Sequence, residues 1–206
     1  LIALAVMLFI GSLGVGSLSL RELWSAPTLG HFVVMEVRLP RTLLALISGM
    51  AFGGVGAVLQ GFLRNPLVDP GVIGIASASA CGAFTALALG ITWWGIYTAP
   101  LFGMIGAVVL TSFLYFIVQR TPTSLTLILI GMAINSFFGA LIALILNMSK
   151  NPYANMEILF WLMGSFENYA LGHVLSILPI VMMGWSILLT TRSTLDALSL
   201  GEDMAI

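Results

Sequence analysis

Residues 70–119 read PGVIGIASASACGAFTALALGITWWGIYTAPLFGMIGAVVLTSFLYFIVQ and contain no Asp, Glu, Lys or Arg. Across the whole chain 60% of the residues are hydrophobic and 7% are charged, whereas about 25% of the residues of a soluble domain are charged. The stretches between the charge clusters approach the ~20 apolar residues with which a helix crosses a bilayer. The composition therefore predicts an all-α membrane protein, a polytopic bundle of transmembrane helices.

Six spans are expected, and the turn between the second and the third is the most clearly marked. Asn65-Pro66 should end the second span, because proline disfavours helical geometry in the residue before it. Asp69-Pro70 should begin the third, with a carboxylate that can cap free N–H groups and a proline suited to the first helical position. The expected spans cover residues 1–20, 42–63, 71–90, 100–119, 125–148 and 170–191, with a polar connection at 21–41 and a short interfacial or re-entrant helix at 157–165.

The charges limit the partners and leave the orientation open. A net charge of −1 offers no basic field for nucleic acid. Six crossings would place both chain ends on one side of the membrane. The basic residues then divide three against four, with Arg64, Arg120 and Arg192 on that side and Arg21, Arg38, Arg41 and Lys150 on the other. This division gives no positive-inside signal.

Small residues recur at four-residue spacing and predict close helix contacts, because apolar helices in lipid associate where their backbones can approach. The amides Asn135 and Asn147 share one such stripe, and they should face protein or water, either in interhelical hydrogen bonds or along a translocation pathway. Gln60 has the same two interpretations. The stripes are Gly49, Gly53, Ala57 and Gly61; Gly74, Ala78, Gly82, Ala86 and Gly90; and Gly131, Asn135, Gly139, Ala143 and Asn147.

Three motifs carry a resemblance to a known family by their order and spacing. They are Arg38-Leu-Pro-Arg41, Gln60-x-x-x-Arg64-Asn-Pro-Leu67 and Asp69-Pro-Gly-Val-Ile-Gly74. Together they resemble the FecCD/BtuC-like permease family of ABC importers for iron–siderophores, haem and vitamin B12, and the likeness continues through residues 129–135, 160–165 and 198–202.

The resemblance implies an architecture larger than this chain. Family members have about ten transmembrane helices per subunit and act as homodimers in the bacterial inner membrane. Residues 1–206 would then be a single permease domain truncated at its C-terminus, with both ends of the fragment cytoplasmic. A separate ABC ATPase subunit would hydrolyse ATP and a substrate-binding protein would deliver the cargo. That cargo would be an iron–siderophore or related metal chelate or, as the alternative within the family, haem, a corrinoid or an oxyanion. No cofactor or metal site is implied.

The resemblance also assigns roles to particular residues, and each has a plainer alternative. Arg38 and Arg41 would meet acidic residues of the binding protein, or would anchor the chain at the lipid headgroups. Thr123 and Ser124 match a cytoplasmic gate, although both hydroxyls also suit helix capping.

Two further matches lie near the end of the chain. The first flanks the pathway in relatives and is otherwise an interfacial aromatic anchor beside a turn; it comprises Trp161, Gly164 and Ser165. The second begins the coupling helix that contacts the ATPase, expected at residues 195–206, and is otherwise an exposed amphipathic tail; it comprises Leu198, Leu200, Gly201 and Glu202.

Two other classes of function lack the residues that they need. An ion-coupled carrier would require carboxylates inside the spans, and none is expected there. An intramembrane enzyme would require a catalytic constellation, and the nearest candidate is His173 with Ser176, which no buried acid orients. A transporter subunit without a catalytic site of its own is therefore expected.

Overall fold

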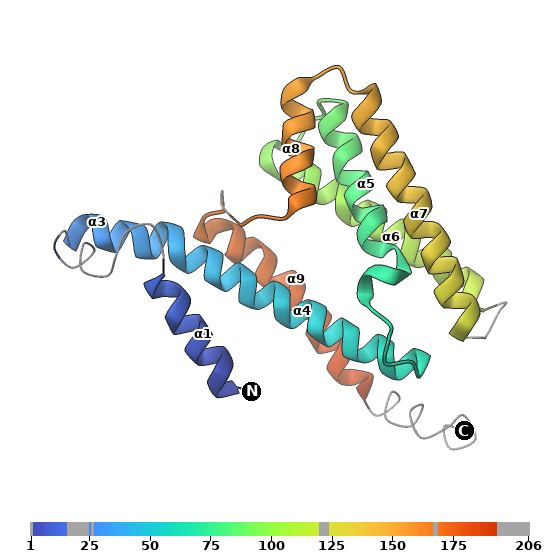
Figure 1. Ribbon diagram of the computed structural model, residues 1–206, viewed down its shortest axis with the longest axis horizontal. Coiled ribbons are helices and arrows are strands. Elements are labelled where there is room, and N and C mark those ends of the chain that lie inside the picture. The colour runs from blue at the N-terminus through green and yellow to red at the C-terminus, as the bar shows by residue number, and fades with distance from the viewer. Residues whose placement is uncertain (1, 16–24, 26, 120–123, 167–168, 193–206) are drawn as a thin grey trace. The chain divides into compact units, whose positions relative to one another are not determined.

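A computed structural model describes residues 2–15, 25, 27–119, 124–166 and 169–192 (Figure 1). Every regular element in these ranges is helical, which confirms the all-α fold class. The described chain divides into two compact units, one within Leu1–Gly54 and Ser165–Asp196 and the other within Val55–Gly164.

The first unit packs α9 against the first part of α4. Its core residues Leu44 and Ile47 lie against Val174. At Gly54 a methyl group would lie 2.7 Å from the ring of Trp185, so the two helices approach closely there. The elements of this unit are α1 (Ile2–Gly14), α3 (Pro27–Phe32), the π-helix η1 (Val33–Arg38), the start of α4 (Leu39–Leu63) and α9 (Leu171–Thr190).

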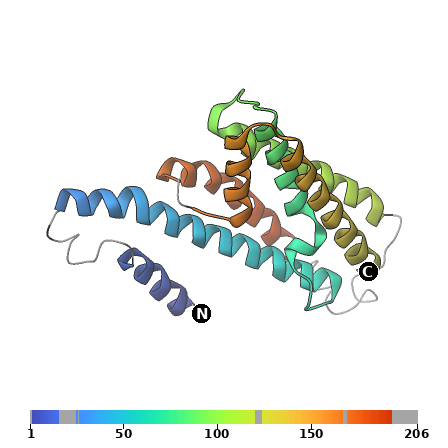
Figure 2. The ribbon, with the colours of Figure 1, turned by 45° about the horizontal axis from the view of Figure 1, so that its top comes forward.

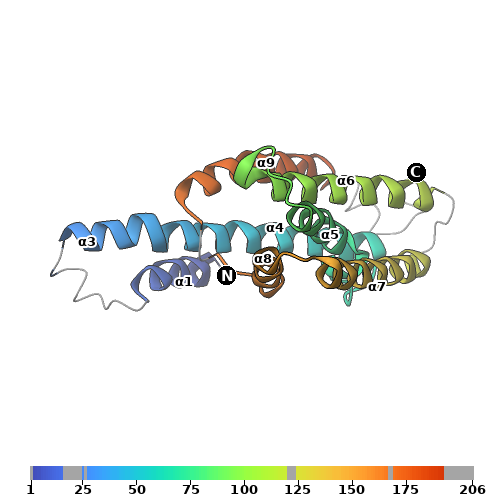
Figure 3. The same cartoon turned by 90° about the horizontal axis from the view of Figure 1, so that it is seen from above.

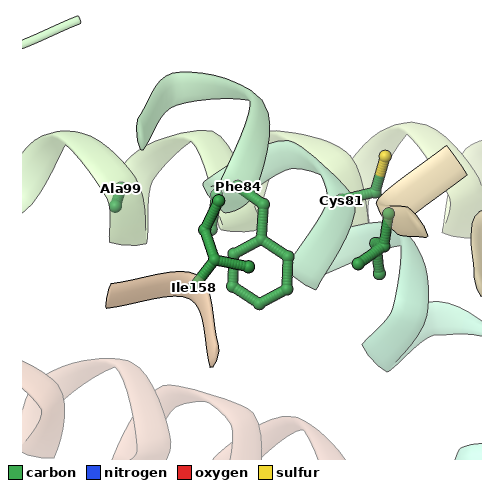
Figure 4. Packing of buried hydrophobic residues seen from close by; sticks show 6 residues of the cluster. Cys81, Phe84, Ala99 and Ile158 are labelled. Carbon is green, nitrogen blue, oxygen red and sulfur yellow. The ribbon is translucent and has the colours of Figure 1, made fainter. Parts of the chain in front are cut away.

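The second unit is built around α5, which lies between α6 and α7 when seen from above (Figure 3). Phe84 of α5 and Ile158 of α8 fill its centre, beside Cys81 and Ala99 (Figure 4). The elements of this unit are the end of α4, the 3₁₀ helix η2 (Pro70–Ile73), α5 (Ile75–Ala88), the 3₁₀ helix η3 (Gly95–Tyr97), α6 (Thr98–Val118), α7 (Ser124–Met148) and α8 (Pro152–Met163).

Four helices of the described part are long and apolar enough to cross a membrane: Thr28–Leu63, Gly95–Val118, Leu125–Met148 and Leu171–Thr190. The second and the fourth to sixth expected spans overlap these four helices, the fourth and the sixth extending one residue past a helix end. Where the first and third spans are expected, the structure has shorter apolar helices, Ala3–Gly14 and Ile75–Ala88.

The expected polar connection at 21–41 is wrong from Pro27 onward, because helix runs without interruption from there into α4 (Figure 2). Pro40 lacks an N–H and would disrupt an ordinary helix. Here the wider π-helix η1 precedes it, and the N–H of Leu39 donates to the carbonyl of Val34, five residues back.

The helical run contains a carboxylate, Glu36, although none was expected inside a membrane span. The run has 36 residues, or about 54 Å of helix, against a hydrocarbon core of about 30 Å. If residues 42–63 fill the core, Glu36 lies six residues beyond it, roughly 9 Å away. The exposed Glu36 side chain is therefore compatible with a position outside the hydrocarbon.

The short helix α8 begins at Pro152, five residues before its expected start at 157. Asn151 caps it: its side chain accepts from the N–H of Tyr153 at 3.0 Å and of Ala154 at 3.5 Å. This cap and the proline after it define a helix start upstream of the one expected from the sequence. The helix ends at Met163, before Gly164 with φ +72°.

Candidate functional site

The turn after α4 is closed by the amide of Gln60. Its Nε2 donates to the carbonyl of Val68 at 3.2 Å, and its backbone carbonyl accepts from the N–H of Asn65 at 3.1 Å. Arg64 adopts φ +48°, the one positive φ of a non-glycine residue in the described part of the chain. The left-handed residue reverses the chain, and the Gln60 side chain holds the two arms of the turn together.

The second half of the turn is held by short side chains that bond to nearby backbone. Asn65 Oδ1 accepts from the N–H of Leu67 at 3.0 Å, next to Pro66, and Asp69 Oδ1 accepts from the N–H of Gly71 at 2.7 Å. Asp69 with Pro70 thus begins a helix, as the sequence predicted, but the helix is the 3₁₀ element η2. Gly74 (φ +83°) then redirects the chain into α5.

This turn packs directly on α7, and the contact leaves no room for a side chain at Gly74 or Gly131. A methyl group at Gly131 would lie 2.6 Å from the carbonyl oxygen of Val72 and 2.9 Å from the Cα of Ile73. A methyl group at Gly74 would lie 2.8 Å from the side chain of Ile134. Glycine is required on both sides of this contact, which joins the turn to the middle of α7.

Asn135 lies beside the same contact, where its Oδ1 accepts a hydrogen bond from the hydroxyl of Ser77 on α5. Of its two interpretations, the interhelical hydrogen bond is present. The pathway role stays a prediction, since the Asn135 side chain is otherwise exposed. Ser77 and Gly131 complete this junction. The small-residue stripes predicted a close contact at Gly131, whereas no role was predicted for Ser77.

Small residues form tight contacts on α5 and α6 but not on every predicted stripe. A methyl group at Gly106 would lie 2.5 Å from the carbonyl oxygen of Ala78, and one at Gly82 would lie 2.4 Å from the carbonyl oxygen of Phe102. By contrast, a methyl group would meet nothing within 4 Å at the stripe positions Gly49, Gly53, Gly61 and Gly139. The open positions leave parts of α4 and α7 available for contacts outside the described residues.

The two arginines of the first motif have different surroundings. Arg38 is only 8% exposed, and its Nη1 donates to the carbonyl of Leu13 at the end of α1, at 2.9 Å. Arg41, three residues on, is half-buried.

Of the remaining predicted site residues, three lie near the end of α8. Trp161 packs edge-on against Phe84 with ring centroids 6.4 Å apart, and Gly164 and Ser165 form the exposed segment after the helix. Ser124 is the first residue of α7. The others lie outside the described residues: Thr123, Leu198, Leu200, Gly201 and Glu202.

A groove of about 590 Å³ runs between α5, α6 and α7, lined by apolar residues such as Phe102, Phe113 and Phe137. Within the described residues no group of three or more His, Cys, Asp or Glu side chains could hold a metal ion. The described part of the molecule therefore offers packed junctions, apolar surfaces and hydrogen-bonding amides.

Long apolar helices, packed through glycines and joined by a capped turn, define a polytopic helical membrane protein. Within that class, the chain belongs to the FecCD transport family, whose profile matches residues 1–206. The match confirms the family that the three motifs had indicated.

Individual relatives agree with this assignment. The chain is 36% identical to the molybdate import system permease protein MolB of Haemophilus influenzae, over 98% of this chain and 63% of that protein. It is 33% identical to the cobalamin import system permease protein BtuC of Halobacterium salinarum, over 88% of this chain and 49% of that protein. The chain thus spans less than two thirds of the length of these relatives.

A solved structure shares the fold. It is an inward-facing ABC transporter assigned to the metal-chelate type, and it superposes with a TM-score of 0.83 at 35% identity, covering 98% of this chain and 64% of that one. The described helices therefore match the fold of an ABC transporter permease.

Proposed function

We propose that this chain is part of the transmembrane permease subunit of a binding-protein-dependent ABC importer in a bacterial inner membrane. The family match along all 206 residues carries this proposal, and relatives named as import permeases support it. In this function the chain performs no chemistry. It supplies helices that open a pathway alternately to either side while a separate subunit hydrolyses ATP.

The cargo that we favour is an iron–siderophore or a related metal chelate. The solved relative of the metal-chelate type supports this choice. A molybdate-like oxyanion is the second candidate, because MolB is 36% identical to this chain. Amides such as Asn135 could hydrogen-bond either cargo, so the choice between them needs a direct measurement.

The proposed partners occupy opposite faces of the membrane. An acidic face of the substrate-binding protein docks at the arginine motif on the outer side, where charge pairs steer association and fix register. The ATPase contacts the segment that contains Gly201 and Glu202 on the cytoplasmic side, where both ends of this fragment also lie. A second permease copy completes the pathway as a homodimer.

Reconstitution tests this function directly. The full-length permease, its ATPase and its binding protein are placed in proteoliposomes, and ATP hydrolysis and uptake are measured with the binding protein either empty or loaded. Stimulated hydrolysis with uptake of labelled ferric hydroxamate supports the favoured cargo, whereas uptake of labelled molybdate alone supports the oxyanion. Hydrolysis and uptake that do not respond to any loaded binding protein would overturn the proposal.

Coupling has its own test. Substitutions at Gly201 or Glu202 should leave basal ATP hydrolysis intact while lowering uptake, because the contact that transmits ATPase motion is weakened. Unchanged uptake per ATP hydrolysed would remove these residues from the coupling contact.

A further inference from the structure

The C-terminal end of α1 is held by an arginine from a different part of the chain. Helix ends leave carbonyl groups without intrahelical partners, and α1 ends at Gly14, one residue after Leu13. The Leu13 carbonyl accepts a hydrogen bond from Arg38 Nη1 at 2.9 Å, across 25 positions of sequence. A cation at this end of a helix is also favoured by the helix dipole.

Two hydroxyl groups make a second connection between the same elements. Ser12 Oγ lies 3.1 Å from Thr42 Oγ1 and shares its one proton between that oxygen and the carbonyl of Phe9, 2.8 Å away. Thr42 Oγ1 donates to the carbonyl of Arg38 at 2.8 Å. The side chain of Arg38 therefore reaches α1 while its backbone is tied to Thr42. We call Ser12, Leu13, Arg38 and Thr42 the α1 clasp.

Arg38 and Arg41 differ in how deeply they are buried. Arg38 is only 8% exposed, and turning outward to a carboxylate on another protein would break its bond to the part-buried Leu13 carbonyl. Leaving that acceptor without a partner is costly. Arg41, on the same helical run, has a buried Nε, but its side chain is half-buried and so more exposed than that of Arg38. One motif thus contains an inward-facing and a more accessible cation.

We propose that Arg38 is a positioning residue that fixes α1 against the segment carrying Arg41, and that Arg41 supplies the docking charge. This inference rests on the proposed function for the docking role of Arg41. Loss of Arg38 would release α1 and change how the segment with Arg41 is presented, without removing a contact to the binding protein.

A disulfide across the clasp separates positioning from docking. In a Cys81→Ser background of the full-length permease, Ser12→Cys with Thr42→Cys places two thiols where the hydroxyl oxygens are 3.1 Å apart, close enough for a disulfide after small adjustments. This pair is combined with Arg38→Gln or, as the matched control, with Arg41→Gln. Disulfide formation is followed in membranes, and uptake is followed in the reconstituted complex.

We expect the pair to cross-link readily with Arg38 present and about tenfold more slowly with Arg38→Gln. Uptake by Arg38→Gln should fall about tenfold when the pair is reduced and recover to within about twofold of the unsubstituted motif when it is oxidised. Arg41→Gln should cross-link normally, bind the binding protein more weakly and gain nothing from oxidation.

Equal cross-linking rates with and without Arg38 would overturn the clasp. So would an oxidised Arg38→Gln permease that stays slow and binds the binding protein as weakly as Arg41→Gln, because Arg38 would then be a docking residue. If the unsubstituted complex takes up no cargo, the proposed importer function fails. The cross-linking rates, measured on the permease alone, still decide whether Arg38 positions α1.

Discussion

Gly131 of α7 offers the sharpest test of the junction between the turn and α7. A methyl group there would lie 2.6 Å from the carbonyl oxygen of Val72 and 2.9 Å from the Cα of Ile73. Both atoms belong to backbone, so no flexible side-chain end can move away. Gly131→Ala must therefore push η2 away from α7 by several tenths of an ångström or more, and the Ser77–Asn135 hydrogen bond beside it should weaken.

The size of the effect follows from a comparison with Gly139, on the same helix, where a methyl group meets nothing within 4 Å. Replacing glycine by alanine inside a helix is worth up to about 1 kcal/mol in helix propensity. Because this gain is common to both positions, the difference between Gly131→Ala and Gly139→Ala isolates the cost of overpacking. That cost is about 1–3 kcal/mol.

The assay is equilibrium unfolding of the purified full-length permease in mixed micelles of a mild detergent and dodecyl sulfate, followed by circular dichroism. Gly139→Ala should be as stable as the unsubstituted protein or slightly more stable, and Gly131→Ala should be less stable than Gly139→Ala by about 1–3 kcal/mol. Equal free energies of unfolding for the two variants would refute the close contact. Equal slopes of free energy against denaturant show that the comparison is sound.

Three further outcomes are expected. Asp69→Ala should cost about 1 kcal/mol in the same unfolding assay, because it removes the cap on Gly71, whereas Asp69→Ser should recover most of it; equal losses in the two variants would count against the cap. Asn151→Ala should destabilise α8 by a similar amount, seen as faster amide hydrogen exchange confined to that helix, and unchanged exchange there would contradict it. Arg41→Glu should slow association with the binding protein about tenfold at low salt, measured by surface plasmon resonance, with a smaller effect at high salt; an association rate insensitive to charge reversal would remove Arg41 from docking.

Much of the helical layout could be read from hydrophobic length and turn chemistry. α6, α7 and α9 lie where long apolar stretches end at charges or at aromatic and proline-rich turns. The turn that contains Asn65 and Asp69 has the capping bonds that these residue types favour. These predictions succeed because they depend on local physics, which acts within a few residues of sequence.

The remaining features depend on contacts that no local pattern records. From the sequence, Pro40 was expected near the end of a polar connection. In the structure it lies in a helix, whose preceding turn is widened into the π-helix η1. Arg38 was expected at the surface, because its partner, the Leu13 carbonyl, is a backbone group 25 positions away and leaves no pattern in the sequence. The third span is shorter than expected because Gly74, in a left-handed conformation, separates η2 from α5.

The π-helix at Val33–Arg38 also rotates the side chains of the preceding helix α3 about the helix axis relative to those of α4. A hydrogen bond closed over five residues, as from Leu39 to Val34, adds the turn of an extra residue, about 100°, to the 3.6-residue repeat. A helical wheel drawn from α4 back to α3 would therefore misplace the residues before Val33 by roughly a quarter turn. Consecutive thiol labelling along residues 28–48 should show one repeat on each side of η1, out of step by roughly a quarter turn.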